Sequence, residues 1–210
     1  MQLIFPVLPE DLPAGLLSEV LFPDADDIRG LRFSAQQAQG LDLRGCDVEQ
    51  CRFVGCRFTQ CKLEDFRFSD VLFESCDLSN LRLPDCSFRR VAFCNCKLSG
   101  AECSGATFRD VAFQHTIAPY TNFLGGNWKS CLWQSTDFSE AFFAESTFSS
   151  MALEDCRLVR ADFSRSRLEA VDYRSCDIQS VRWTLSQLKG STISYEQAVQ
   201  LVEESGIRVK

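Results

Sequence analysis

The chain has 210 residues, of which 45% are hydrophobic and 24% are charged, and its formal net charge is −7. Its 22 basic residues are interleaved with acidic ones, whereas a protein that binds nucleic acid by neutralising phosphates needs clustered Lys and Arg. No stretch approaches the roughly 18 apolar residues of a membrane span. The first residues have neither the positive region nor the uninterrupted apolar region of an export signal, so we expect none. Twelve cysteines without such a signal indicate reduced thiols. We therefore expect a soluble, cytoplasmic protein that binds neither membranes nor nucleic acid directly.

Residues 1–30 lie outside the repeat that follows them. They combine apolar residues such as Leu12, Leu17 and Leu21 with Pro23 and several acidic residues. A stack of repeats exposes apolar surface at its two ends and needs atypical caps there. We therefore predict that this segment is an N-terminal cap, either a short helix or an irregular stretch over the open end.

Residues 31–193 follow a strict five-residue period. Every fifth residue from Phe33 to Ile193 is apolar, and 14 of these 33 central positions are Phe. The residue two before each centre is small or apolar, and ten of the twelve cysteines occupy it. Two inward residues separated by an outward one describe a short extended segment. The other two residues must then turn a corner, so each group of five is one side of a coil and the chain is a solenoid.

The repeat offers no enzyme or metal site. Cys46, Cys51, Cys56 and Cys61 recur every five residues, which is not the paired spacing of zinc ligands. In the inward column they are expected to fill space as small hydrophobic residues. His115, the only histidine, falls at an outward position, and no phosphate-binding glycine motif is present. We predict a protein without catalytic residues, cofactor or metal.

Typical groups of five such as 51–55 and 161–165 resemble the pentapeptide-repeat family, whose pattern is A(D/N)LXX with Leu or Phe at the centre. The resemblance implies an all-β fold, a right-handed quadrilateral parallel β-helix with about twenty residues per coil. The 33 sides then make about eight coils, and at about 4.8 Å per coil the rod is about 40 Å long. Pro119 and the pair Gly125 and Gly126 lie within this repeat, and we expect a local bulge or kink there because Pro cannot donate to a ladder.

The period changes after the repeat, and residues 194–210 are predicted to form a short helix and a tail. Ser194 and Gln197 have the spacing of a capping box. Leu201 and Val202 follow at helical spacing. A helix of about ten residues is not stable alone, so it must pack on the last coil or on a partner.

The segment from Ile193 to Val209 is similar to the end of the Qnr- and MfpA-type proteins and of immunity proteins made by producers of topoisomerase poisons. In that group the C-terminal helix and tail join two rods end to end, and the proteins bind type II topoisomerases as proposed mimics of a DNA segment. The resemblance implies a homodimer, with Leu201, Val202, Ile207 and Val209 in dimerisation, and DNA gyrase or topoisomerase IV as partner. Many Qnr proteins carry loops between repeats that matter for protection against quinolones, and this chain has no such insertion.

Acidic residues provide the first candidate surface for such a partner. One group lies within two adjacent coils and a second follows later in the chain; the nine residues are Glu64, Asp65, Asp70, Glu74, Asp85, Glu140, Glu145, Glu154 and Asp155. They form either an ordinary solvated face or a surface that competes with DNA for a basic groove. Duplex DNA carries about 24 charges along such a rod. A net charge of −7 therefore predicts mimicry through shape and a local acidic face.

An apolar outward column is the second candidate surface. At twenty-residue spacing, one side of the rod carries Leu72, Ala92, Ala112, Leu132 and Ala152. This strip either contacts a partner or is covered by the apolar N-terminal segment.

We predict from these features a non-enzymatic, homodimeric, DNA-mimicking protein that binds a type II topoisomerase and modulates it or protects it from quinolone-like poisons, as in antibiotic resistance. The alternative is a pentapeptide-repeat scaffold that binds an unrelated protein, with the apolar strip as its contact.

Overall fold

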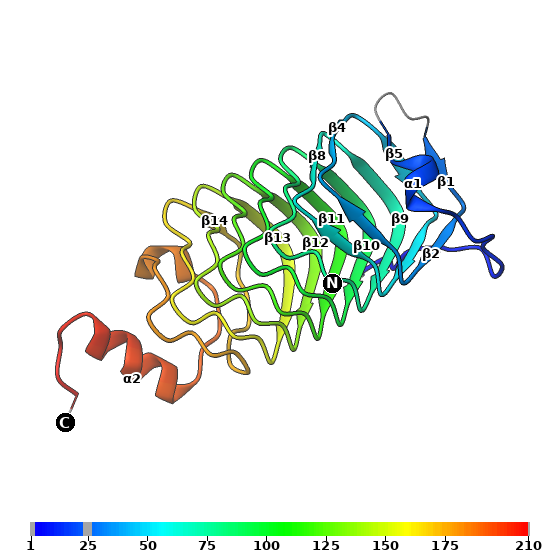
Figure 1. The fold of residues 1–210 in the computed structure, drawn as a ribbon. Coiled ribbons are helices and arrows are strands. Elements are labelled where there is room, and N and C mark those ends of the chain that lie inside the picture. The colour runs from blue at the N-terminus through cyan, green and yellow to red at the C-terminus, as the bar shows by residue number, and fades with distance from the viewer. Residues whose placement is uncertain (1–2, 23–26, 210) are drawn as a thin grey trace.

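The computed structural model describes residues 3–22 and 27–209, and it shows a parallel β-solenoid with short helices at its two ends (Figure 1). The expected fold class is confirmed. The short strands of the first coils are β1 (Ile28–Arg29), β2 (Arg32–Ser34), β3 (Gln37–Gln39), β4 (Asp42–Arg44), β5 (Asp47–Glu49), β6 (Arg52–Val54), β7 (Arg57–Thr59) and β8 (Lys62–Glu64). The later elements are β9 (Arg67–Glu74), β10 (Ser87–Cys94), β11 (Thr107–Gln114), β12 (Asn127–Gln134), β13 (Thr147–Glu154), β14 (Arg167–Leu168), the 3-10 helix η1 (Leu185–Leu188) and the helix α2 (Tyr195–Glu204).

Each residue pairs with the residue twenty positions further along the chain. The parallel register runs from Ile28↔Val48 in the first coil to Asp172↔Thr192 in the last. Five residues per side and twenty per coil give four sides. We name them by the centres of one coil: the first side contains Phe53, the second Phe58, the third Leu63 and the fourth Phe68, each with its equivalents at intervals of twenty.

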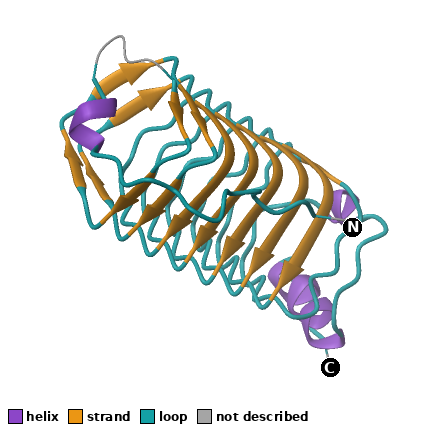
Figure 2. Cartoon of the chain, turned by 90° about the vertical axis from the view of Figure 1, so that its right-hand side faces the viewer, coloured by secondary structure: helices purple, strands orange, loops and turns teal. Residues whose placement is uncertain are grey.

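The long strands β9 to β13 run continuously over the fourth and first sides, and they form the ladder visible in Figure 2. The second and third sides are closed by tight turns, for example Leu81 N–H to Leu78 O at 3.2 Å. The corner residue of nearly every side has a positive φ, including Asp65 at 57° and Asp85 at 56°. Asn, Asp and Gly tolerate this left-handed region best, which explains why the corner column is polar and glycine-rich.

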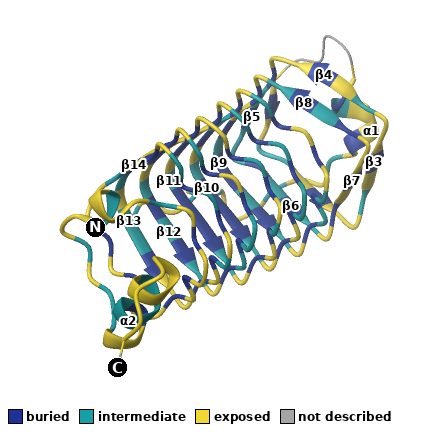
Figure 3. Ribbon diagram, turned by 90° about the vertical axis from the view of Figure 1, so that its left-hand side faces the viewer, coloured by how far each residue is buried: buried dark blue, intermediate teal, exposed yellow. Residues whose placement is uncertain are grey.

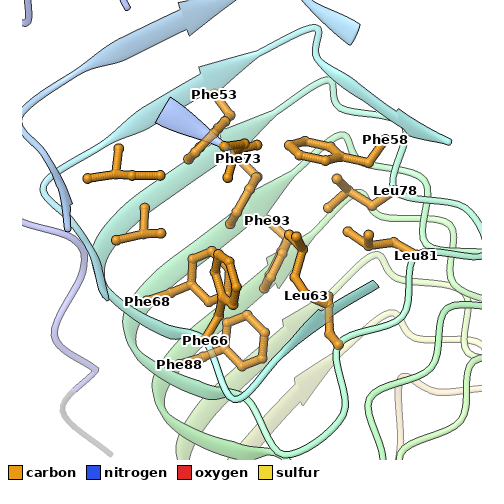
Figure 4. Close-up of a pocket in the computed structure, with 14 residues that line it drawn as sticks. Phe53, Phe58, Leu63, Phe66, Phe68, Phe73, Leu78, Leu81, Phe88 and Phe93 are labelled. Carbon is orange, nitrogen blue, oxygen red and sulfur yellow. The ribbon is translucent and has the colours of Figure 1, made fainter. Parts of the chain in front are cut away.

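The centres point into the bore and stack from coil to coil. The rings of Phe53 and Phe73 lie 4.8 Å apart and those of Phe73 and Phe93 lie 5.0 Å apart, both nearly parallel (Figure 4). Figure 3 shows the resulting line of buried residues along β9 to β12. Burial raises the pKa of the Cys86 and Cys131 thiols to about 12, in keeping with their place as small apolar side chains in the inward column.

The expected bulge or kink near Pro119 was wrong, because the ladder keeps its register through this stretch from Lys97↔Ile117 to Asn122↔Phe142. Pro119 stands one residue after a centre, where backbone N–H groups do not enter the ladder, and its carbonyl accepts from Gly100 N–H at 2.9 Å. Gly125 takes the usual corner conformation with φ 69°. Gly126 makes room for an indole, since a Cβ there would lie 2.8 Å from Trp128 Nε1.

The N-terminal segment both caps the rod and extends beside it. The short helix α1 (Leu17–Val20) contributes the buried Leu17 to the core at the first coil. Gln36 clamps the segment, since its side chain accepts from Leu17 N–H at 2.8 Å and donates to Gly15 O at 2.6 Å. From there toward lower residue numbers the chain leaves the end of the rod and runs beside the body of the solenoid, where Val7 reaches Asp70 (Figure 1).

The C-terminal end is closed by two glutamine clamps. The predicted capping box of α2 is confirmed: Ser194 Oγ accepts from Gln197 N–H at 3.2 Å, and Gln197 Oε1 accepts from Ser194 N–H at 2.8 Å. The buried Gln197 amide also donates to the carbonyls of Tyr173 and Cys176, each at 2.8 Å. Gln187 makes the same pair of bonds ten residues earlier, to the carbonyls of Phe163 and Ser166. These amides add a donor at backbone carbonyls of the last coil.

Candidate partner-binding surfaces

The structure does not gather the nine predicted acidic residues on one face. Five border the third side of the rod, namely Glu64, Asp65, Asp85, Glu140 and Glu145, and four border the first side, namely Asp70, Glu74, Glu154 and Asp155. In a four-sided coil these two sides are opposite. Each of the two groups that the sequence predicted is therefore divided between opposite sides of the rod, because every five residues the chain turns a corner onto the next side.

Most of these carboxylates are also neutralised within the chain. Five of the nine form ion pairs with a residue on a neighbouring coil: Glu64 with Arg44, Asp70 with Arg90, Glu74 with Arg52, Glu140 with Arg160, and Glu145 with Arg165. Glu64 also pairs with Lys62 on its own side. The exposed pairs among these contribute little to stability, whereas the pair of Asp70 and Arg90 is largely buried. All of them leave only part of each acidic group available to a partner.

The net charge of −7 does not come from the solenoid. Residues 28–193 contain twenty acidic and twenty basic residues, so the repeat body has no net charge. Residues 1–27 contain six acidic residues and no basic one, and residues 194–210 contribute a net −1. The acidic character of the protein is therefore concentrated at its two ends.

The apolar column is assembled as the spacing predicted. Adjacent strands place Leu72, Ala92, Ala112, Leu132 and Ala152 in direct register. Although these positions point outward, Ala92 and Ala112 are only 2% and 1% exposed. The N-terminal segment lies against this edge of the first side, because Val7 N–H donates to the Asp70 carboxylate at 3.0 Å, two residues before Leu72. These observations favour a covered strip over an open partner surface.

The C-terminal end exposes apolar side chains. Leu201 packs against the core, whereas Val202, Ile207 and Val209 are 37%, 60% and 42% exposed. Tyr195, on the first turn of α2, is 77% exposed. Figure 1 shows α2 and the tail projecting beyond the last coil. Of the four predicted dimerisation residues, three are therefore exposed and one packs against the core.

The described residues hold no group of three or more His, Cys, Asp or Glu side chains that could bind a metal ion. The enclosed space among the first coils is about 20 Å³ and is lined by core residues such as Phe58, Phe66 and Phe88 (Figure 4). No described helix is long and apolar enough to cross a membrane.

The family profile described as a pentapeptide repeat region matches residues 66–136 and 126–201, more than half of the chain. The chain belongs to the pentapeptide-repeat family. No curated protein matches the sequence significantly. Among solved structures, full-length QnrB1, a plasmid-mediated fluoroquinolone resistance protein, is 19% identical, covering 84% of this chain and 100% of that chain with a TM-score of 0.36. A trypsin-treated QnrB1 is 21% identical, and the match covers 87% of this chain and 99% of that chain with a TM-score of 0.35. HetL, involved in heterocyst differentiation regulation in Nostoc sp. strain PCC 7120, is 13% identical. The match covers 81% of this chain and 88% of that chain with a TM-score of 0.32.

Sequence reasoning missed one anchor in this pentapeptide-repeat protein. Asp70 is buried at a corner, where Arg90 Nε donates to it at 2.7 Å and Val7 N–H donates from the N-terminal segment. Burial alone would raise the pKa of Asp70, but these donors outweigh it and lower the pKa. The pairing of Asp70 with Arg90 follows from the twenty-residue spacing, whereas the contact with Val7 has no repeat to predict it.

Proposed function

We propose that this pentapeptide-repeat protein is a non-enzymatic, homodimeric binding protein for a type II topoisomerase, DNA gyrase or topoisomerase IV. In this proposal the rod takes the place of a DNA segment in the enzyme, and it thereby modulates the enzyme or protects it from quinolone-like poisons.

The observation that carries the proposal is the C-terminal segment. Residues 193–209 are the part of the chain that is similar to the Qnr- and MfpA-type ends, and they form a clamped helix with an exposed apolar tail at the end of the rod. Apolar side chains concentrated at one end favour an end-to-end contact between two copies. Two rods of about 40 Å joined in this way present a length of about 80 Å, comparable to a bound DNA segment of some 24 base pairs.

The charge distribution indicates which side of the rod would face a basic groove. The N-terminal segment lies beside the first side and carries the exposed Glu10 and Asp11. The first side itself adds the exposed Glu154 and Asp155. We therefore propose that the first side, together with the N-terminal segment, is the acidic face. The predicted acidic residues on the third side would then point away from the enzyme.

The experiment is a titration of gyrase supercoiling with this protein, in the presence and absence of a fluoroquinolone. Inhibition of supercoiling, or rescue from the drug, is expected. Neither effect on gyrase, together with no effect on topoisomerase IV decatenation at excess protein, would refute the proposal. The variant Glu154→Lys with Asp155→Lys should weaken the effect, whereas Asp137→Lys with Asp177→Lys, on the second side, makes the same change in charge and should not.

A scaffold that binds an unrelated protein is the second candidate, and the electroneutral repeat body favours it. Binding through shape and apolar contact depends weakly on salt, whereas an acidic face in a basic groove loses affinity steeply as salt rises. Measuring gyrase affinity at low and at high salt distinguishes the two. Weak salt dependence, or no gyrase binding, would favour the scaffold.

A further inference from the structure

The fourth side of the rod carries a row of like charges. Arg89, Arg109 and Lys129 lie on three consecutive strands and are paired in direct register. All three side chains are exposed. Ser69 precedes the row and Ser149 follows it in the same column. The row is therefore a bounded patch of three cations on neighbouring coils.

This row departs from the way in which the chain arranges charge elsewhere. In several other columns a basic residue pairs with an acidic one on a neighbouring coil, as Arg67 does with Asp47 and Arg182 with Asp162. Arg32 with Arg52 and Lys62 with Arg82 are like-charged neighbours in register, but each of these runs is two residues long and one member has a close acidic partner, Glu74 for Arg52 and Glu64 for Lys62. Among the described residues, neither Arg89 nor Lys129 forms an ion pair, and Arg109 has only its neighbour Asp110 at 3.9 Å. Like charges directly opposite each other on adjacent strands are destabilising. The row therefore costs stability, which suggests that it is kept for another purpose.

The acidic residues of the adjoining corner column, Asp70 and Asp110, offset the row only in part. Asp110 approaches Arg109 alone, at 3.9 Å, and its side chain is 12% exposed. Asp70 occupies the adjoining corner, but its carboxylate is bonded to Arg90 and to Val7 N–H. Its side chain is only 8% exposed, so it has little surface left to offer. The positive charge of the row consequently faces solvent.

A second row lies parallel to the first and is neutral. Ser87, Thr107 and Asn127 stand two residues before the cations on the same strands and are also in register. The two rows flank a groove of about 360 Å³ along the rod axis, whose lining includes Phe88 and Phe108. Both aromatic residues are 1% exposed. The groove thus has cations along one wall, hydrogen-bonding side chains along the other, and no exposed aromatic residue.

We propose that this groove binds an extended acidic segment of a partner protein. Carboxylates of the segment contact Arg89, Arg109 and Lys129, and its backbone bonds to the row of Ser87, Thr107 and Asn127. Carboxylates on one face of an extended segment recur about every 6.6 Å, and two coil spacings, about 10 Å together, separate the ends of the row, so two successive carboxylates of that face lie within the length of the row. The surface lies on a different side from the proposed topoisomerase contact and does not depend on that function.

The same charges are less suited to nucleic acid. Proteins that bind single strands combine cations with exposed aromatic side chains on which bases stack, and the groove has none. Duplex binding draws its affinity from many phosphate contacts, whereas this patch has three cations on a chain with a net charge of −7. A short acidic peptide requires only the local patch.

The test uses the full-length protein and fluorescence anisotropy. The probes are a fluorescein-labelled peptide of alternating Glu and Thr, the matched peptide with Gln in place of Glu, and an oligothymidylate of the same length. The variant combines Arg89→Gln, Arg109→Gln and Lys129→Gln. The matched control combines Arg57→Gln, Lys97→Gln and Arg157→Gln, three exposed outward residues of the second side with the same change in net charge.

The native protein should bind the Glu peptide and not the Gln peptide. The row variant should lose about tenfold or more in affinity and the control less than about threefold, since each exposed charge contact contributes modestly. Thermal melts should show both variants folded, with the row variant at least as stable as the native protein. Equal loss in the two variants, tighter binding of the oligothymidylate, or no binding of the Glu peptide by the native protein would each overturn the proposal.

Discussion

The contact between Asp70 and the N-terminal segment gives the sharpest test of how this rod is assembled. Replacing Asp70 by Ala removes the acceptor of Val7 N–H and leaves the largely buried Arg90 without its partner. A hydrogen bond to a charged group contributes about 1.5–3 kcal/mol. Unpairing a buried charge costs about 3–5 kcal/mol when burial is complete. Because Arg90 keeps 22% of its side-chain surface exposed, the cost is smaller than the sum of these two contributions, and we expect about 3 kcal/mol in total.

Hydrogen exchange read by mass spectrometry measures the local effect. In Asp70→Ala the amide of Val7 and its neighbours should exchange about tenfold faster or more, because Val7 N–H no longer has the Asp70 carboxylate as its acceptor. Asp110→Ala is the matched control, since Asp110 occupies the same corner column two coils away and makes no bond to the N-terminal segment. Unchanged protection at Val7 in Asp70→Ala, or an equal change in the control, would refute the reasoning.

The same contact predicts a dependence on pH. The pKa of Asp70 is lowered in the folded protein, because the bonds from Arg90 and Val7 outweigh the effect of burial. A group whose folded pKa is depressed stabilises the fold at pH values above its unfolded pKa, and this contribution is lost as pH falls through the folded value. Protection of Val7 should therefore persist at neutral pH and decline only in acid. Protection that declines between pH 7 and pH 6 would contradict this assignment.

Four further predictions follow from the core and the two ends. Gln197→Ala should cost about 1–3 kcal/mol in denaturant unfolding, because the Cys176 carbonyl loses its donor and the Tyr173 carbonyl keeps only that of Cys176 N–H; no loss would contradict the clamp. Gly126→Ala should destabilise by about 1–3 kcal/mol through overpacking, and Trp128→Phe should relieve part of this; an additive double variant would contradict the contact. The free energy of unfolding should fall as pH rises from about 9 to about 12, since the pKa of Cys131 is raised by burial; a flat profile would contradict burial of the thiols. Val202→Arg should leave the fold intact and halve the mass in light scattering, and an unchanged mass would remove Val202 from the dimer contact.

The solenoid was predictable because the sequence pattern that specifies it is only five residues long and is repeated along the chain. Each centre such as Phe53 or Phe73 occupies the same environment, so a single five-residue pattern specifies the whole bore. The capping box at Ser194 and Gln197 was likewise visible as a spacing in the sequence. The kink expected at Pro119 was wrong because the pattern alone does not show that N–H groups at that repeat position stay outside the ladder.

The surfaces were harder to predict because they depend on which side each residue occupies. Glu64 and Glu74 are ten residues apart and fall on opposite sides, so a cluster in the sequence is not a cluster in space. Arg89, Arg109 and Lys129 are distant in sequence and adjacent in space, and reading the chain at intervals of twenty would have shown the row. The path of residues 3–16 beside the rod has no periodic signal at all.

Competition between this protein and DNA for the enzyme tests the central claim most directly. Gyrase bound to a labelled linear duplex is titrated with the protein, and the release of DNA is followed by anisotropy. The account predicts that the protein displaces the duplex, and that Val202→Arg displaces it less effectively because the rod is then half as long. A ternary complex in which gyrase holds DNA and this protein together, or no displacement at saturating protein, would contradict it.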